Sequence, residues 1–297
     1  MASAAVDRAE YAAYRVGAAI APRIPPAVGD AGARWVGRAL AHALPARRAQ
    51  VARNLRRILG PVPDAELEPR VTRTFENYGR YWYELFRLSS ESPDRLEARM
   101  QTDGYERLAV ALDAGRGAIV ALPHIGGWDF GAAWFTVQGH ALTVVVEAVE
   151  PPELFEWFVN QRSAVGMDVV PIGPDAAARV ARALHENRVV ALLSDRDLTG
   201  DGIDVEFFGE QTTMPGGPAL LALRTGAPIL PVAVYFRPDG MHLGVMQEPV
   251  PTKREGRLRD DVARVTQGLA RRFEALIRAA PEQWFVLQPN WPSDREA

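Results

Sequence analysis

The 297-residue sequence contains no cysteine and only one lysine, Lys253. Without cysteine there is no disulfide, no thiolate nucleophile and no cysteine-ligated zinc or iron–sulfur site. A Schiff-base mechanism would depend on the single lysine, which lies in a polar stretch, so we set this class of chemistry aside. Catalysis must therefore use histidine, carboxylates, hydroxyl side chains or arginine.

The sequence also lacks an excess of basic residues and a long apolar run. Its formal net charge is −3, which gives no support to nucleic acid as a partner, because such binding depends on neutralising phosphates. The first twenty residues contain Asp7 and Glu10 within an interrupted apolar stretch, which argues against a signal peptide or a spanning helix. We expect a cytosolic protein whose contact with a membrane is peripheral.

Two patterns follow each other along the chain. Residues 1–92 show helical periodicity, and proline-containing breaks separate predicted helices at 31–44, 46–59 and 64–88. From 93 to 297, short apolar runs alternate with helical patterns. The predicted strands are 117–122, 142–146, 168–171, 189–193 and 229–236. The predicted helices are 127–137, 152–165, 175–187, 218–226 and 258–279.

This alternation predicts an α/β fold with a mixed, mostly parallel central sheet flanked by helices. We expect the helical N-terminal region (1–92) to pack on the α/β domain (93–297), so that the chain forms a single structural unit. The N-terminal helices could present Trp35 and Arg38 to a membrane, or they could form an ordinary helical layer with one buried stripe.

The most informative motif follows the first predicted strand, where His124 and Asp129 flank Gly126 and Gly127. The carboxyl ends of strands are where α/β proteins bind ligands. His124 offers an imidazole that titrates near neutral pH, and Asp129 could hold one ring N–H so that the other nitrogen accepts a proton. The glycines would leave backbone amides open to a ligand, where they could stabilise an oxyanion.

No nucleophile is recognisable elsewhere in the sequence. It has no Gly-x-Ser-x-Gly elbow and no Gly-x-x-x-x-Gly-Lys loop, and the remaining histidines lack the spacing of metal ligands. We therefore predict no metal site, and we predict that His124 activates a hydroxyl group of the substrate. The plainer interpretation is a capping or core histidine beside an unrelated carboxylate.

Several segments resemble the lipid A-type acyltransferases. The His-x-x-x-x-Asp motif is similar to the signature that this family shares with the glycerolipid acyltransferases. Further blocks that resemble the family are 46–59, 189–209 and 213–231. Segments that look most like the phosphatidylinositol mannoside acyltransferases of actinobacteria are 78–82, 195–199 and 284–291. The resemblance extends from about residue 47 to residue 291.

The resemblance implies transfer of a palmitoyl-type chain from acyl-CoA to a mannose hydroxyl of a phosphatidylinositol mannoside, at the cytoplasmic face of the cell membrane. Transfer would be direct, with acyl-CoA as co-substrate and no further cofactor. Three alternatives stay open: an acyltransferase for another lipid, such as a lysophospholipid or a lipid A-like glycolipid, a lipid or acyl-CoA hydrolase, and a non-catalytic lipid-binding relative. The acyl chain would need an apolar tunnel, and its candidate lining residues are Trp128, Phe130, Trp134, Phe135 and Phe158.

Position by position, the resemblance makes His124 the catalytic base, Asp129 its partner and Asp195 an acidic residue needed for activity. Two departures stand out: the family's Glu-Arg-Asp is here Asp-Arg-Asp at 195–197, and its Ser-Gly-Asn-Trp is Ile-Gly-Gly-Trp at 125–128. The residues expected to contact substrate or acyl-CoA are Glu147, Arg162, Gly126, Gly127, Arg196, Asp197 and Trp128.

Plainer interpretations exist for these positions as well. Arg162 could bind a phosphate of CoA, or it could pair with Glu147 or Glu156 on a helix surface. Segment 195–197 could be a solvated loop at a strand end. We expect the aromatic side chains of Trp284 and Phe285 to pack in the core.

Overall fold

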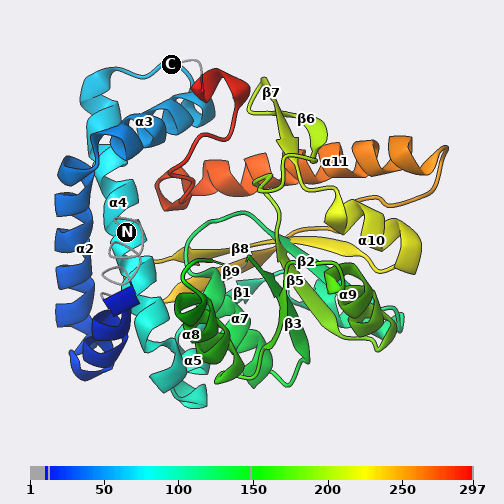
Figure 1. Ribbon diagram of the computed structural model, residues 1–297, viewed down its shortest axis with the longest axis horizontal. Helices are drawn as coiled ribbons and strands as arrows, with labels where there is room; N and C mark the ends of the chain where they lie inside the picture. The colour runs from blue at the N-terminus through cyan, green and yellow to red at the C-terminus, as the bar shows by residue number, and fades with distance from the viewer. Residues whose placement is uncertain (1–10, 13, 148, 296–297) are drawn as a thin grey trace.

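A seven-stranded sheet forms the centre of the protein, shown in a computed structural model that describes residues 11–12, 14–147 and 149–295 (Figure 1). Its strands are β1 (Met100–Asp103), β2 (Ala118–Leu122), β3 (Leu142–Val146), β4 (Asp168–Pro171), β5 (Val189–Leu193), β8 (Ile229–Phe236) and β9 (His242–Met246). The strand order is β1-β9-β8-β2-β5-β3-β4. Strands β8, β2, β5, β3 and β4 run parallel to one another, and only β8 and β9 pair in antiparallel fashion.

The central strands are apolar throughout because helices cover both faces of the sheet. Every residue of β2 and β8 is buried. In β2, Ile119 and Ala121 join the hydrophobic core on one face, whereas Val120 and Leu122 join the core on the other face. This alternation follows the two-residue period of a strand and explains why unbroken apolar runs predicted these two strands.

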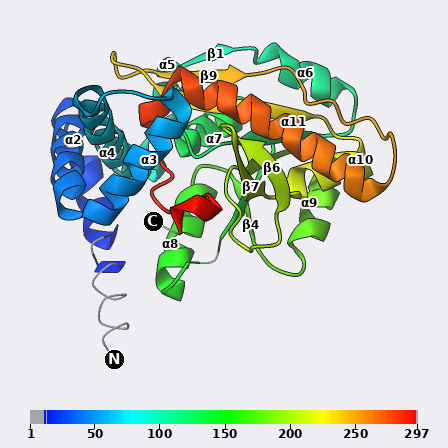
Figure 2. The same cartoon turned by 90° about the horizontal axis from the view of Figure 1, so that it is seen from above.

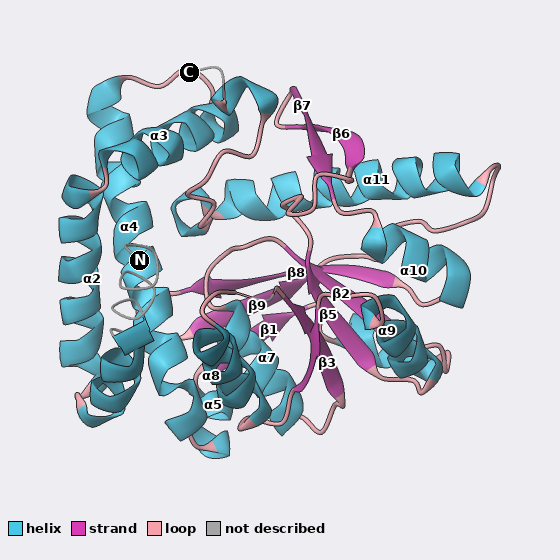
Figure 3. Cartoon of the chain, in the orientation of Figure 1, coloured by secondary structure: helices cyan, strands magenta, loops and turns pink. Residues whose placement is uncertain are grey.

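The helices of the α/β part divide between these two cores (Figure 3). One core contains side chains of α9 (Ala176–His185), α10 (Gly217–Thr225) and α11 (Leu258–Ala279), and α11 also packs against a separate hairpin of β6 (Ile203–Phe207) and β7 (Glu210–Met214). The other core contains side chains of α5 (Pro93–Ala98), α6 (Glu106–Asp113), α7 (Trp128–Val137) and α8 (Pro152–Ser163). The short helices η3 (Pro281–Gln283) and η4 (Pro292–Asp294) follow α11.

The N-terminal helices stand together at one side of the sheet (Figures 1 and 2). They are η1 (Ala21–Arg23), α2 (Pro26–Ala43), α3 (Pro45–Leu59) and α4 (Asp64–Arg87), and η2 (Leu88–Ser90) ends the group. Helices α2 and α4 cross closely because each presents a glycine: a Cβ on Gly37 would lie 2.2 Å from the carbonyl oxygen of Phe75, and one on Gly79 would lie 2.2 Å from that of Ala33. Helix α4 also contacts α7 and thereby joins the N-terminal helices to the sheet.

The predicted fold class is confirmed, and the bounds of β3, β4, β5, β8 and α11 agree with the prediction. Strands β1, β6, β7 and β9 and helices α5 and α6 were not predicted, because they are short and mix polar with apolar residues. The division at residue 92 stays a prediction. Asp7 and Glu10 lie outside the described residues, so the expectation for the N-terminal segment also stays a prediction. Among the helices that are described, none has the length and hydropathy needed to cross a bilayer.

Candidate active site

His124 meets Asp195 at the carboxyl end of two neighbouring parallel strands. Strands β2 and β5 pair in register up to Leu122 and Leu193, and the amide of Ser194 donates to the carbonyl of Leu122 (2.9 Å). The residues after each strand then turn into the site within two positions. The Nδ1 atom of His124 lies 2.5 Å from Oδ1 of Asp195, and the backbone amide of His124 donates to Oδ2 of the same carboxylate (2.9 Å).

The Asp195 carboxylate is completely buried and remains charged. Burial opposes the charge, but the imidazole of His124, the indole N–H of Trp284 (2.7 Å) and the His124 amide together hold the pKa of Asp195 below its usual value. A charged carboxylate accepts hydrogen bonds only, so Nδ1 of His124 carries the proton and donates it. The other ring nitrogen, Nε2, is therefore the one available to accept a proton, and the His124 side chain is 20% exposed.

The contact predicted between His124 and Asp129 is not formed. Asp129 lies in the first turn of α7, is buried, and accepts two hydrogen bonds from Arg162, at Nε (2.8 Å) and Nη2 (3.1 Å). It accepts a third from the hydroxyl of Tyr81 (2.9 Å). The fork of an arginine matches both carboxylate oxygens, so this carboxylate is already satisfied, whereas parallel strand pairing delivers Asp195 to the imidazole.

Arg162 and Tyr81 complete a buried cluster with Asp129 that ties α8 and α4 to the start of α7. Burial alone would lower the pKa of Arg162, but the charge of Asp129 raises it. Burial and the same charge raise the pKa of Tyr81 well above its usual value, so the phenol stays protonated and donates. Arg162 therefore pairs with Asp129 and with neither Glu147 nor Glu156, the partners considered from the sequence.

The prediction of open amides at Gly126 and Gly127 is wrong. The amide of Gly126 donates to the carbonyl of Gln283 (2.9 Å), and that of Gly127 donates to the carbonyl of Val234 (2.8 Å). Gly126 has φ +61°, and a Cβ there would lie 2.0 Å from the carbonyl oxygen of Val234. The glycines are needed because the turn that carries His124 docks directly on the backbone of β8.

The remaining predicted contact residues differ in their surroundings. Glu147 is exposed just beyond β3. Arg196 follows Asp195, is half-buried, and has no carboxylate within ion-pair distance among the residues that the structure describes. Asp197 instead organises its own loop: it accepts hydrogen bonds from the amides of Gly200 and Gly202 and from the Thr213 hydroxyl. Burial opposes its charge, but these bonds lower the pKa of Asp197.

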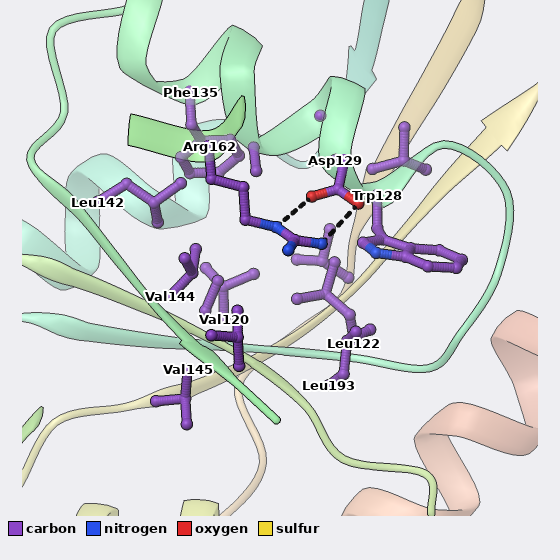
Figure 4. Close-up of a pocket in the computed structure, with 16 residues that line it drawn as sticks. Val120, Leu122, Trp128, Asp129, Phe135, Leu142, Val144, Val145, Arg162 and Leu193 are labelled. Atoms are coloured by element: carbon purple, nitrogen blue, oxygen red, sulfur yellow. Dashed lines mark hydrogen bonds and ion pairs between the residues drawn. The ribbon is translucent and has the colours of Figure 1, made fainter. Parts of the chain in front are cut away.

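An apolar cavity lies between α7, α8 and the sheet, and its lining includes Trp128, whose ring contacts that of His124 (Figure 4). Its empty volume, including the open space at its mouth, is about 620 Å³. Its lining residues are Val120, Leu122, Trp128, Asp129, Gly131, Ala132, Phe135, Leu142, Val144, Val145, Val146, Arg162, Ala191, Leu193, Val232 and Val234. Of the five aromatic residues predicted to line a tunnel, two line this cavity, Trp128 and Phe135. The Arg162–Asp129 pair is the polar part of the lining.

Within the described ranges, no three histidine, aspartate or glutamate side chains come together as metal ligands.

The chain matches the family described as bacterial lipid A biosynthesis acyltransferase over residues 7–293. The chain belongs to this family. It is therefore an acyltransferase, and the family resemblance inferred from its motifs is confirmed.

Two relatives of this acyltransferase are phosphatidylinositol mannoside acyltransferases. The one from Mycobacterium tuberculosis is 39% identical over 270 residues, which cover 89% of this chain and 82% of the relative. The one from Mycolicibacterium smegmatis is 39% identical over 248 residues, which cover 82% of this chain and 80% of the relative.

The candidate site contains three side chains that were not predicted from the sequence. Tyr81 binds Asp129 and stacks on Trp128, with 4.2 Å between ring centroids. Trp284 is buried, as expected for a core residue, but its indole also binds Asp195. The Asn290 side chain donates to the carbonyl of Asp195 (3.3 Å). All three lie in the segments 78–82 and 284–291, whose similarity to the family was the only signal that could have indicated them.

Trp128 connects the His124–Asp195 pair with the apolar cavity. Its ring lies edge-on to the His124 ring, with 5.6 Å between centroids, and it also lines the cavity. Leu122 and Leu193, which precede His124 and Asp195 by two residues each, line the same end. A long apolar group in the cavity can therefore place its polar end beside His124.

Proposed function

We propose that this acyltransferase transfers a palmitoyl-type chain from acyl-CoA to a mannose hydroxyl of a phosphatidylinositol mannoside. The observation that carries the proposal is the buried Asp195 bound to a part-exposed His124, whose ring contacts Trp128 in the wall of an apolar cavity. The names of the two relatives supply the class of acceptor. Acyl-CoA is a co-substrate, and no further cofactor takes part.

The reaction proceeds by general base catalysis. Nε2 of His124 removes the proton of the acceptor hydroxyl while the oxygen attacks the thioester carbonyl. The tetrahedral intermediate then collapses, the carbon–sulfur bond breaks, and the proton on His124 passes to the departing CoA thiolate. Asp195 stabilises the imidazolium between these steps, as its lowered pKa allows. No covalent acyl-enzyme forms.

The apolar cavity holds the acyl chain. Its walls are mainly valine and leucine side chains from β2, β3, β5 and β8, so each methylene that enters gains about 0.8 kcal/mol from burial. This lining supports a long saturated chain as the transferred group.

Arg196 binds a phosphate group of one of the two substrates. It lies next to Asp195, and its guanidinium has no carboxylate partner in the described part of the chain. Arginine presents a planar fork that suits phosphate oxygens. Glu147, exposed beyond β3, is available to the sugar hydroxyls of the acceptor. Arg162 and Asp129, by contrast, satisfy each other and shape the cavity wall.

The face of α2 turned away from α4 contacts the cytoplasmic face of the cell membrane. Val28, Trp35 and Val36 lie on this face and are 63%, 69% and 48% exposed. Their spacing of seven and eight residues places them on one stripe of the helix. A tryptophan with this exposure suits the membrane interface, because its ring combines an apolar body with a polar N–H. Contact is peripheral, through the surface of the helix.

The test is an assay of the purified chain with palmitoyl-CoA and a mannosylated phosphatidylinositol in vesicles, with separate measurement of acylated lipid and free fatty acid. We expect acylated lipid from the unmodified chain and from His185→Ala, which alters an exposed histidine of α9. His124→Ala should lower the rate by about 10²- to 10⁴-fold. Acylated lipid formed equally well by His124→Ala would overturn the role of the base, and fatty acid alone would indicate a hydrolase.

A further inference from the structure

A second cavity lies on the same face of the sheet as the apolar cavity. It has an empty volume of about 290 Å³ and is lined by side chains of β1, α7, β8 and β9, together with Tyr105. Four residues line both cavities: Gly131 and Phe135 of α7, and Val232 and Val234 of β8. The apolar cavity extends over β3, β5, β2 and β8, and the second cavity continues over β8, β9 and β1. The two cavities therefore lie in series beneath α7.

The boundary between the cavities has a backbone part and a side-chain part. At Gly131 the helix lies so close to β8 that a Cβ would be 2.6 Å from a methyl carbon of Val234. One turn further along α7, Phe135 contributes its ring to the walls of both cavities. Removing the contact at Gly131 would require moving the helix, whereas the Phe135 part of the boundary is a side chain that a substitution can shorten.

Phe135 also lies at the far end of the apolar cavity from the His124–Asp195 pair. Figure 4 shows Phe135 and Leu142 on one side of the cavity and Trp128 on the other. Trp128 is the residue that contacts the His124 ring. An acyl chain whose carbonyl lies beside His124 therefore extends past Val120 and Val144 toward Phe135.

We propose that the Phe135 ring ends the space for the acyl chain and so limits the length of the chain that the protein transfers. This inference rests on the proposed function, because it requires the acyl chain to occupy the apolar cavity. The ring is held in place by edge contacts with Trp134 (5.7 Å between centroids) and Tyr105 (5.9 Å). The second cavity behind it is mainly apolar, with Met100, Trp134 and Met246 in its walls, and removal of the ring would add the space of the ring to it.

The experiment measures kcat/KM for saturated acyl-CoA donors of increasing chain length in Phe135→Ala. Each methylene that enters the second cavity should raise kcat/KM for the longer donor, relative to palmitoyl-CoA, by about fourfold. Phe135→Leu, which removes less of the ring and keeps an apolar side chain in the core, should shift the preference in the same direction by a smaller factor. Thermal unfolding of both variants shows whether each is folded, and the Leu variant supplies the answer if the Ala variant is not.

Gly244 provides the matched control, because it lines only the second cavity. A Cβ at this position would have its nearest neighbours at 3.6–3.8 Å, an ordinary contact distance, so the first carbon of a side chain fits without a clash. Gly244→Leu alone should leave the chain-length profile unchanged, because the wild-type acyl chain does not reach the second cavity. Combined with Phe135→Ala, it should abolish the gain for longer donors.

Two results would overturn the inference. One is an unchanged chain-length profile in folded, active Phe135→Ala and Phe135→Leu. The other is a gain for longer donors that persists when Gly244→Leu fills the second cavity, because the chain would then lie elsewhere. Both results require an active wild type and leave the proposed function intact, whereas failure of the wild type to transfer any acyl group would overturn the proposed function itself.

Discussion

Two histidine–carboxylate pairs occur among the residues that the structure describes, and the imidazole is partly exposed in only one of them. In the first, Nδ1 of His124 lies 2.5 Å from Asp195, and the His124 side chain is 20% exposed. In the second, Nε2 of His242 lies 2.8 Å from Glu84, and His242 is completely buried. The pairing chemistry is the same, so the exposure of the imidazole separates the two.

The surroundings of the second pair, His242 and Glu84, indicate a structural role. The His242 ring stacks on Phe130, with 3.9 Å between centroids. Glu84 also forms ion pairs with Arg80 (3.2 Å) and Arg99 (3.1 Å). The pair joins α4 to β9 and lies directly under the turn of His124, where a Cβ on Gly127 would be 2.9 Å from the His242 ring. A buried histidine–carboxylate pair can thus support an active site without taking part in its chemistry.

The largest expected effect is that of Asp195→Asn on kcat. The amide cannot stabilise the imidazolium and can hold His124 in the wrong tautomer, so we expect kcat to fall by about 10²- to 10⁴-fold. Initial rates at saturating palmitoyl-CoA and acceptor measure it. Glu84→Gln is the matched change at the second pair and should keep kcat within about threefold of the wild type. Equal losses of kcat in the two variants would contradict the distinction between the pairs.

Glu84→Gln should instead have the larger effect on stability. Removing one charge from a buried ion-pair network typically costs about 3–5 kcal/mol, because Arg99 loses its partner and Arg80 is left with Asp30 alone (3.4 Å) among the described carboxylates. Denaturant unfolding at pH 7 measures the free energy of unfolding. An unfolding midpoint equal to that of the wild type would show that the second pair does not stabilise the link between α4 and the sheet.

Acid unfolding tests the direction in which pH changes the contribution of Glu84 to stability. Burial opposes the charge of Glu84, but His242, Arg80 and Arg99 lower its pKa from 4.5 to about 2. A carboxylate with a lowered folded-state pKa stabilises the fold fully above its unfolded pKa. The Glu84 contribution should therefore be complete above pH 4.5 and disappear as the pH falls toward 2, and Glu84→Gln should lack this part of the acid sensitivity.

Asp129→Asn should lower the stability less than Glu84→Gln does, and it should lower kcat less than Asp195→Asn does. The amide keeps one acceptor for the Arg162 fork but leaves a buried guanidinium without its counter-charge, so we expect about 2–3 kcal/mol less stability. Because Asp129 does not touch His124, the loss of kcat should be smaller than in Asp195→Asn. Arg162→Met in the Asp129→Asn background removes the orphaned charge and should recover part of the stability. A fall in kcat as deep as that of Asp195→Asn would restore Asp129 as a partner of the base.

The sequence predicted those parts of the fold that depend on local patterns. The apolar runs of β2 and β8 were sufficient because both faces of these strands are buried. The position of His124 at a strand end followed from the same reasoning. The partner of His124 did not, because the contact with Asp195 spans 71 residues and depends on the register of β2 against β5. The nearest carboxylate in the sequence, Asp129, was the wrong partner.

The packing of Gly126 and Gly127 against distant backbone could not be predicted, for a similar reason. Their amides bind the carbonyls of Val234 and Gln283, which lie more than 100 residues further along the chain. Glycines after a strand are equally compatible with an open anion site and with a turn packed on backbone. Only the position of β8 decides between these possibilities, and no spacing within the motif carries that information.

The smallest expected effect is that of Trp284→Phe, which tests how far the surroundings of Asp195 tune the first pair. The substitution keeps an aromatic ring in the core and removes one N–H donor, at 2.7 Å, from a carboxylate that also binds the amide and the imidazole of His124. One hydrogen bond to a charged group contributes about 1.5–3 kcal/mol. Only part of this bears on the reaction, because the carboxylate is charged throughout, so we expect kcat to fall by about 3- to 10-fold. The pKa of Asp195 should rise, since the indole is one of the groups that lower it. A rate identical to that of the wild type would mean that the two His124 contacts alone hold the carboxylate, and that Trp284 only fills the core.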